Sequence, residues 1–353
     1  MDRNRKYRAA ALAAFMALAL SACALPWSKS PDEDDKDRDV ISEEQKEMPT
    51  IVINSGQSFA EDVTEEVREA AKETEEKAAP EETQAEEPPA ATIIDKMACE
   101  PGQEVYLDPS WEYASFSKIH DGAAVYYAAT GENRNGIVVG VNAGHGTKGG
   151  ESVKTYCHPD MSPKTTGGTT GAGAIEAYAV SSGMSFDDGT PEAKVTLKLA
   201  QFMRDDLLAA GYDVLMLRDS DDVQLDNVAR TVICNNVADC HIAIHFDGDG
   251  LDTDKGCFFI SVPDGIKGMP PVDRTWHMSD ELGARIVNAL SAGGHKLHSG
   301  GKMAIDLTQT SYSTIPSVDV EYGNQSSDIS DAALQSLAAD TVVGIEDFFD
   351  VSN

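Results

Sequence analysis

Two histidines each follow a short apolar run that has the composition of a buried strand. His145 lies between two glycines, four residues after the run at 137–141, and His245 follows the run at 242–244. Glycines on either side of a histidine let the backbone turn tightly and expose the imidazole. In open α/β sheets, ligands bind at the edge formed by the carboxyl ends of the strands. Both imidazoles are therefore expected at that edge.

Two glutamates are expected at the same place. Glu192 begins a helical segment directly after a proline, and Glu321 follows the strand pattern at 316–320. Two histidines and one carboxylate are a common ligand set of catalytic zinc, and they leave one coordination position open for water. Brought together, Glu192 and the two histidines would form such a site. Glu321 would be a candidate general base beside it.

The elements that must position these residues follow from the hydrophobic periodicity. Strand-like runs alternate with helical patterns from residue 136 onward. Strands are predicted at 137–141, 212–217, 241–245, 257–262 and 317–321, and helices at 193–210, 225–235, 282–290 and 331–349. This alternation predicts one α/β domain over residues 136–353, in which a mostly parallel or mixed twisted sheet carries helices on both faces. Residues 93–135 are expected to form an N-terminal extension packed on this domain.

The first 23 residues have the pattern of an export signal. Four basic residues precede an apolar run at 9–20, which is too short to span a bilayer and leads into Ser21-Ala22-Cys23. Small residues before a cysteine resemble the lipobox of bacterial lipoproteins. This resemblance implies a lipoprotein signal peptide at 1–23 with lipid attached at Cys23. The protein would then be extracytoplasmic, anchored to the outer face of the bacterial cytoplasmic membrane or to the periplasmic side of a membrane; an ordinary secretory signal is the alternative.

The segment after the signal, residues 24–92, is predicted to be a disordered acidic tether. Residues 32–87 hold 21 acidic and 6 basic side chains, and Phe59 is their one aromatic residue. Such a composition cannot bury enough apolar surface to offset the entropy of folding. The whole chain has a formal net charge of −32, which argues against nucleic acid as a partner because its phosphates would be repelled. Five cysteines remain after Cys23, and the sequence leaves open whether they are bridged or free.

The order of the landmarks over residues 136–349 resembles that of the zinc-dependent N-acetylmuramoyl-L-alanine amidases, in the family with a Gly-His-Gly start and a catalytic glutamate on the closing strand. The matching landmarks are Gly144-His145-Gly146, Glu192 with its helix, the stretch 238–245 and the stretch 316–324. The resemblance implies that His145, Glu192 and His245 bind one Zn²⁺ per chain and that Glu321 is the catalytic residue. It also implies a peptidoglycan hydrolase that uses zinc-activated water to cleave the amide bond between N-acetylmuramic acid and the L-alanine of the stem peptide.

The sequence departs from the commoner family pattern in the long stretch 147–190, which is rich in glycine and threonine and is a candidate gate of the site. Because of this stretch, Glu176 remains an alternative to Glu192 as the carboxylate ligand. His241 and His245 are four residues apart on a predicted strand, about 13 Å from one another, so His241 is expected to be structural. Substrate contacts are expected from three further residues: His158, Asp247 and Asn324.

Two other classes of protein are compatible with this pattern. A catalytically silent wall-binding or activator protein on the same fold would have lost a site residue, but all four positions are filled. A zinc peptidase acting on stem peptides would need a cation to hold the terminal carboxylate of its substrate. Arg218 and Arg230 are candidates for that cation, although their places in the family pattern indicate structural roles. We expect a monomer that acts on peptidoglycan.

Overall fold

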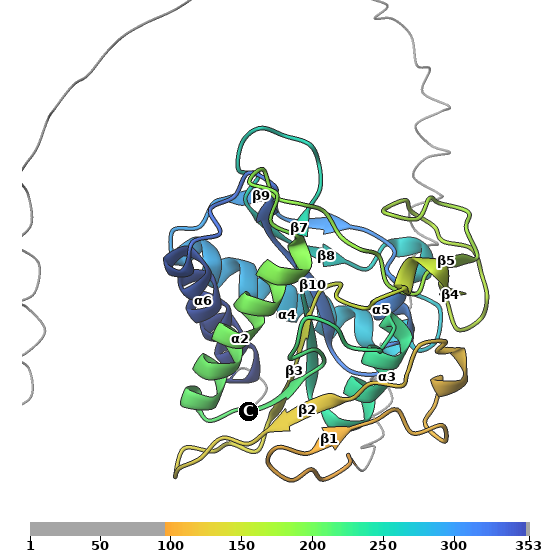
Figure 1. Cartoon of the computed structure of the whole chain (residues 1–353), viewed down its shortest axis with the longest axis horizontal. Coiled ribbons are helices and arrows are strands. Elements are labelled where there is room, and N and C mark those ends of the chain that lie inside the picture. The colour runs from red at the N-terminus through yellow and green to blue at the C-terminus, as the bar shows by residue number, and fades with distance from the viewer. Residues whose placement is uncertain (1–95, 351–353) are drawn as a thin grey trace, which may run out of the picture. The chain divides into compact units, whose positions relative to one another are not determined.

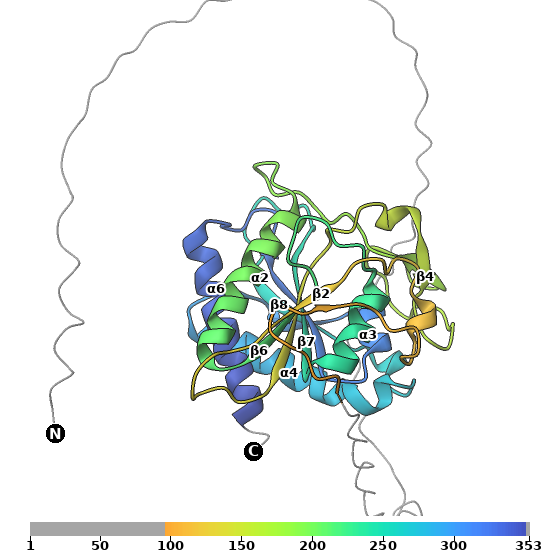
Figure 2. The same cartoon turned by 60° about the horizontal axis from the view of Figure 1, so that its bottom comes forward.

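The computed structural model describes residues 96–350. The predicted signal peptide, the lipid attachment site Cys23 and the acidic tether lie outside the described residues. Within 96–350, no helix combines the length and the apolar character needed to cross a lipid bilayer. These residues form an eight-stranded sheet flanked by helices, which confirms the predicted α/β class (Figure 1, Figure 2).

The main sheet is mixed, and its centre is parallel. The four central strands β6, β3, β7 and β10 run parallel to one another, while β2 and β8 pair antiparallel to β6 and β10. Parallel strands that are covered on both faces have continuously apolar sequences, and residues 139–143 and 240–244 are all buried. In spatial order the strands are β1 (Glu104–Val105), β2 (Ala124–Tyr127), β6 (Asp213–Met216), β3 (Val138–Ala143), β7 (Cys240–Asp247), β10 (Ser317–Asn324), β8 (Cys257–Ser261) and β9 (Leu297–Ala304).

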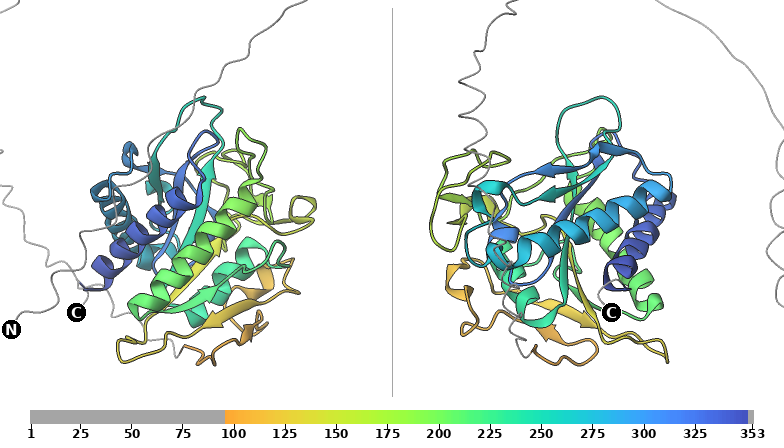
Figure 3. Two further views of the ribbon diagram at one scale, coloured as in Figure 1. Left: turned by 60° about the vertical axis from the view of Figure 1, so that its left-hand side comes forward. Right: turned by 180° about the vertical axis from the view of Figure 1, so that it is seen from behind.

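Helices cover both faces of this sheet, as predicted. One face carries α2 (Glu192–Ala210), α4 (Val272–Ala292) and α6 (Asp331–Asp350), which share a core with β3, β7 and β10. The other face carries α3 (Asn227–Val237) and the short α5 (Thr308–Tyr312), which contact each other. The two views of Figure 3 show α2 and α6 side by side on the first face. The sheet is therefore the middle layer of three.

The residues before the predicted domain are part of the sheet. We expected an extension packed on the domain, but β1 and β2 are hydrogen-bonded strands of it, since β2 pairs with β6. The 3₁₀ turn η1 (Ala114–Phe116) follows β1 and contacts α3. Buried side chains of β1, β2 and β6 share a core with α3. The sheet of the catalytic domain therefore begins at about residue 104.

The long stretch 147–190 has a small structure of its own. It contains the 3₁₀ turn η2 (Gly150–Ser152) and a separate two-stranded antiparallel sheet of β4 (Lys154–Tyr156) and β5 (Glu176–Tyr178). Figure 1 places this sheet at the side of the molecule where α5 lies. A third 3₁₀ turn, η3 (Asp264–Ile266), follows β8. All five cysteines among the described residues are unpaired thiols, and four of them are buried.

Candidate active site

The Gly-His-Gly motif forms a tight turn at the carboxyl end of β3. His145 itself has a φ of 64°, in the left-handed region that non-glycine residues rarely adopt. A Cβ at Gly144 would lie 2.4 Å from Cε1 of His245, and one at Gly146 would lie 2.6 Å from Nε of Arg218. Neither position has room for a side chain. The two glycines therefore allow the His145 turn to lie against β7 and the Arg218 side chain.

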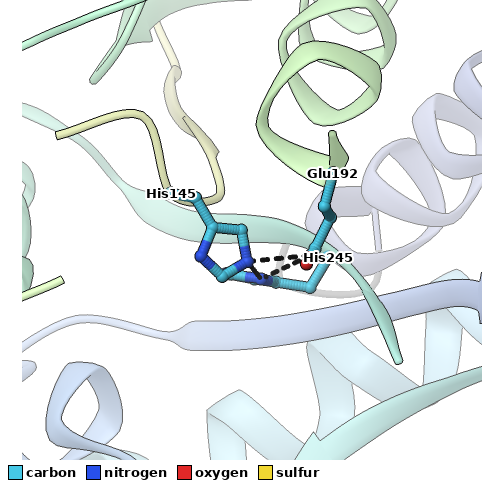
Figure 4. A group of neighbouring side chains, drawn as sticks. All are labelled: His145, Glu192 and His245. Carbon is cyan, nitrogen blue, oxygen red and sulfur yellow. Dashed lines mark hydrogen bonds and ion pairs between the residues drawn. The ribbon is translucent and has the colours of Figure 1, made fainter. Parts of the chain in front are cut away.

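Three predicted ligand residues meet at this turn. His145 follows β3, His245 lies on β7 and Glu192 is the first residue of α2, and Figure 4 shows their side chains pointing toward one another. One donor atom of each lies within 4.8 Å of the other two. Nε2 of His145 lies 2.9 Å from Oε1 of Glu192 and 3.0 Å from Nδ1 of His245, which is 3.1 Å from the same oxygen. The structure thus brings together the set that the sequence predicted.

Hydrogen bonds to the outer atoms fix the orientation of these side chains. Nδ1 of His145 lies 2.8 Å from the carbonyl oxygen of Ser181, to which it donates, so that Nε2 faces the cluster. The backbone N–H groups of Met184 and Phe246 donate to the two oxygens of Glu192, at 2.9 Å and 3.0 Å. Such outer contacts hold metal ligands in their binding orientation. Sequence reasoning missed Ser181, because its contact depends on the path of the 147–190 stretch.

The charges of the cluster stabilise one another. Burial alone would raise the pKa of Glu192, but hydrogen bonds from His145 and His245 outweigh it and lower this pKa well below the ordinary value. Burial alone would lower the pKa of His245, but the carboxylates of Asp319 and Glu192 outweigh it and raise this pKa to about 10. A cation that binds here would have to displace the proton of His245, because ligand imidazoles are neutral.

Two carboxylates of β10 complete the site. Glu321 pairs with His245 across the parallel strands, and Asp319, two residues earlier, lies on the same face of β10. Burial raises the pKa of both carboxyls. The negative charge of the neighbouring Asp319 raises the pKa of Glu321 further. Oε2 of Glu321 and Oδ1 of Asp319 are buried without a hydrogen-bond partner among the described residues. Oδ2 of Asp319 lies 3.8 Å from Nε2 of His245, so a residue that we did not predict faces a candidate ligand.

A cleft opens over this cluster. Its floor includes His145, His245 and Glu321, and one wall comes from the 147–190 stretch, through residues that include Thr169 and Tyr178. Thr308 and Gln309 of α5 line it as well. The long stretch is therefore a wall of the cleft; whether it moves as a gate stays a prediction. Glu176, the alternative ligand, is exposed on β5 and outside the three-residue cluster.

Two of the three residues expected to contact substrate have other roles in the structure. His158 is fully buried and is bonded to Asp306 and Ser162, at 2.8 Å each, which anchors the long stretch to the loop before α5. Asn324 is also fully buried, and its side chain donates to Asp249 and to the carbonyl of Thr253 in the loop between β7 and β8. Neither lines the cleft. This burial left no signal in the sequence, because it depends on the paths of the loops whose polar groups these side chains contact.

The third, Asp247, does line the cleft, next to Phe246 and the cluster. Its carboxylate forms an ion pair with Lys255. That lysine lies 3.3 Å from Asp249 as well, so its charge is shared between two carboxylates. Asp247 therefore remains a candidate for substrate contact, held in place by Lys255.

The two buried arginines are structural. Arg230 donates from Nε to the carbonyl of Leu225 and from its two terminal nitrogens to four acceptors around the His145 turn: Asn142 Oδ1, Ala143 O, His145 O and Thr147 Oγ1. All five of its N–H donors are used. Arg218 donates to the carbonyls of Ala143, Gly144, Ala193 and Ser220. These arginines hold the turn in place, and a terminal carboxylate of a peptidase substrate would find neither of them free.

The comparisons with known proteins identify the family of this chain. A sequence profile described as N-acetylmuramoyl-L-alanine amidase matches residues 139–345. Among solved structures, the chain is similar to the N-acetylmuramyl-L-alanine amidase Ami1 from Mycobacterium smegmatis, with 22% identity over 62% of this chain and 100% of that chain and a TM-score of 0.52. It is also similar to the apo form of Ami1 from Mycobacterium abscessus, with 21% identity, coverage of 61% and 99%, and a TM-score of 0.49. No curated protein matches the chain.

At these identities the likeness to solved structures bears on the fold alone. The sequence profile goes further, because it spans more than half of the chain and runs from β3 into α6. His145, Glu192, His245 and Glu321 all lie within the matched residues. The chain therefore belongs to the N-acetylmuramoyl-L-alanine amidase family, and it is an enzyme that acts on peptidoglycan.

Proposed function

We propose that this amidase works with one Zn²⁺ held by His145, Glu192 and His245. The observation that carries the proposal is the cluster itself, in which two imidazole nitrogens and a carboxylate oxygen lie within 4.8 Å of one another. These are donors that zinc binds well. The surroundings also leave little room for another arrangement, since a Cβ at Gly183 would lie 2.7 Å from Oε2 of Glu192 and from Cδ2 of His145. The residues present thus fit the metal.

Glu321 is the proposed proton carrier. When bound, zinc polarises the scissile carbonyl and makes water a stronger nucleophile at neutral pH. Glu321 lines the cleft and pairs with His245 in the neighbouring strand, so its carboxylate can accept a proton from the attacking water. The same carboxyl then donates the proton to the departing nitrogen. Burial raises its pKa, which makes the carboxylate a stronger base toward the proton of water.

The bond that we propose to be cut joins the lactyl carboxyl of N-acetylmuramic acid to the L-alanine of the stem peptide. Hydrolysis leaves a free carboxylate on the glycan strand and a new N-terminal alanine on the peptide. The cleft has walls from α5 and from the 147–190 stretch, and we propose that these walls hold the substrate on either side of the scissile amide.

The place of action follows from the substrate. Peptidoglycan lies outside the cytoplasm, and the family acts there. We propose further that a lipid on Cys23 anchors the chain to the membrane and that the acidic segment 24–92 spans the distance to the wall as a self-repelling linker. The support for this is the basic, apolar and small-residue pattern that ends at Cys23. We also propose that the enzyme acts as a monomer.

Incubation of the purified full-length chain with isolated peptidoglycan, with and without a zinc chelator, tests the proposal. Mass spectrometry of the soluble products should find peptides with a new N-terminal alanine, and their release should stop with the chelator and return with added zinc. Intact links between stem peptide and glycan, from a protein shown to hold zinc, would refute the proposed reaction. Release that is insensitive to the chelator would refute the proposed metal.

A further inference from the structure

Two of the described residues that line the cleft are a lysine and an arginine. Only one of these two has N–H donors that no protein group uses. Arg230 uses all five of its N–H donors on protein acceptors near the His145 turn. Lys164, from the 147–190 stretch, lines the same cleft and makes one hydrogen bond, to the backbone carbonyl of Asp306. An ammonium group has three donors, so two remain.

The ammonium of Lys164 makes no direct ion pair with a described residue. The residue is only 7% exposed, and no ion pair joins it to an aspartate or glutamate within 4.0 Å in the described part of the chain. The carboxylate of Asp306 is close enough for its charge to interact with that of Lys164, but its oxygens already accept hydrogen bonds, Oδ1 from His158 and Oδ2 from the backbone N–H and hydroxyl of Thr165. A buried ammonium with unused donors costs free energy, and an anion that accepts from those donors would offset that cost.

Carboxylates also line the cleft. Glu321 and Asp319 lie there beside the cluster that contains Glu192, which is the proposed zinc site. Thr169 and Thr170, five and six residues after Lys164, line the cleft as well and are neutral. Among the lysine and arginine side chains of the cleft, Lys164 is therefore the one with free donors for a substrate carboxylate.

We propose that Lys164 binds a free carboxylate of the stem peptide close to the scissile amide, and so makes the enzyme selective for anionic stem peptides. This inference rests on the proposed function. The ligand chemistry is specific: a carboxylate accepts two charge-assisted hydrogen bonds from an ammonium, whereas the matching carboxamide carries no charge and only one good acceptor. Lys164 acts as a specificity residue, apart from the residues that carry the reaction.

The experiment compares one peptidoglycan preparation in two forms. Half is left untreated, and in the other half the free carboxyls are converted to carboxamides with a carbodiimide and ammonium. Release of stem peptides is measured as initial rates over a range of substrate concentrations for the full-length wild type, Lys164→Met, Lys164→Arg and the control Lys148→Met. Lys148 lies in the same stretch but is exposed and lines neither part of the cleft. The ratio of rates on the two substrates is internal to each protein, so it does not depend on the fraction that is folded.

The wild type should prefer the untreated form by about 10- to 100-fold in kcat/KM, the range expected for hydrogen bonds to a charged group. Lys164→Met should lose this preference, mainly through a higher KM on the untreated form, while Lys164→Arg should keep part of it and Lys148→Met all of it. A wild type without the preference, or a Lys164→Met variant that retains it, would overturn the inference. Failure of the wild type to release peptide from the untreated form would instead overturn the proposed function.

Discussion

His241 provides a quantitative test of how the central sheet responds to acid. It lies near the start of β7, the strand that carries His245, and it is fully buried between β3 and β10. Its Nε2 has no hydrogen-bond partner among the described residues. Burial, helped by the positive charge of Arg230, lowers the pKa of His241 to about 3. The folded protein therefore keeps this imidazole neutral at pH values where the unfolded chain, with a pKa of about 6.5, binds a proton.

The direction and size of the effect follow from these two pKa values. Because the pKa is lower in the folded state, the contribution to stability is complete above about pH 6.5 and is lost as the pH falls toward 3. At pH 5, about 1.5 units below the pKa of the unfolded chain, protonation of His241 stabilises the unfolded chain. At 1.36 kcal/mol per pH unit this stabilisation is about 2 kcal/mol. The wild type should thus lose about 2 kcal/mol of unfolding free energy through His241 between pH 7.5 and pH 5.

Urea unfolding of the wild type and His241→Gln at both pH values measures this loss. A chelator is present throughout, so that loss of metal with pH does not contribute. The variant should be less stable at pH 7.5, but its drop between the two pH values should be about 2 kcal/mol smaller than that of the wild type. His277→Gln, on an exposed position of α4, controls for removal of a histidine as such. Equal drops in the wild type and His241→Gln would refute the reasoning.

Two further substitutions test the site and its wall. Glu192→Gln removes the charge that accepts from both imidazoles. It should lower zinc affinity, measured by competition with a chelating indicator, by more than the roughly 10- to 100-fold cost of losing an outer contact. Unchanged affinity would exclude Glu192 as a ligand. Asp306→Ala leaves His158 and Thr165 without their buried acceptor and should cost about 3 to 5 kcal/mol of unfolding free energy, with faster proteolysis within 147–190. A cost below 1 kcal/mol in urea unfolding would show that this anchor is unimportant.

The sequence predicts the central elements because their signals are local. The apolar run at 137–141 became β3 at Val138–Ala143, since a strand covered on both faces needs apolar residues throughout. The predicted helix at 193–210 ends where expected, because Gly211 adopts a φ of 99° that suits glycine at a helix end. The predicted helix at 225–235 begins slightly later, after Asp226, whose side chain caps it by accepting from the N–H of Ala229.

Other elements depend on contacts that no local pattern shows. β9 was not predicted, because Leu297–Ala304 contains two glycines and is largely exposed; its pairing with β8 makes it a strand. The helix predicted at 282–290 begins ten residues earlier, at Val272. The sequence did not indicate this start, because the first turns of the helix bury only a few side chains. β1 and β2 are likewise short, and the partner of β2 is β6, which lies about 90 residues further along the chain.

The same distinction applies to the site. Three of the four residues, His145, His245 and Glu321, were expected at the carboxyl ends of strands and Glu192 at the start of a helix, so the predicted fold placed them near one another. Asp319 carried a usable signal, since it lies two residues before Glu321 and so on the same face of the strand. By contrast, His158 and Lys164 lie in an irregular segment, and Asn324, at the end of β10, is buried by the loop between β7 and β8. The paths of these segments depend on side-chain hydrogen bonds that no local pattern shows.

The most direct test of the central claim measures bound zinc and released stem peptides on the same preparations of the wild type and Glu321→Gln. The substitution removes the proton acceptor but keeps the shape of the side chain, and Glu321 is not among the three clustered ligands. We expect one zinc per chain in both proteins and a rate of release that is lower by roughly 100- to 10,000-fold in the variant. A zinc-loaded Glu321→Gln protein that releases peptides with N-terminal alanine at the wild-type rate would contradict the account.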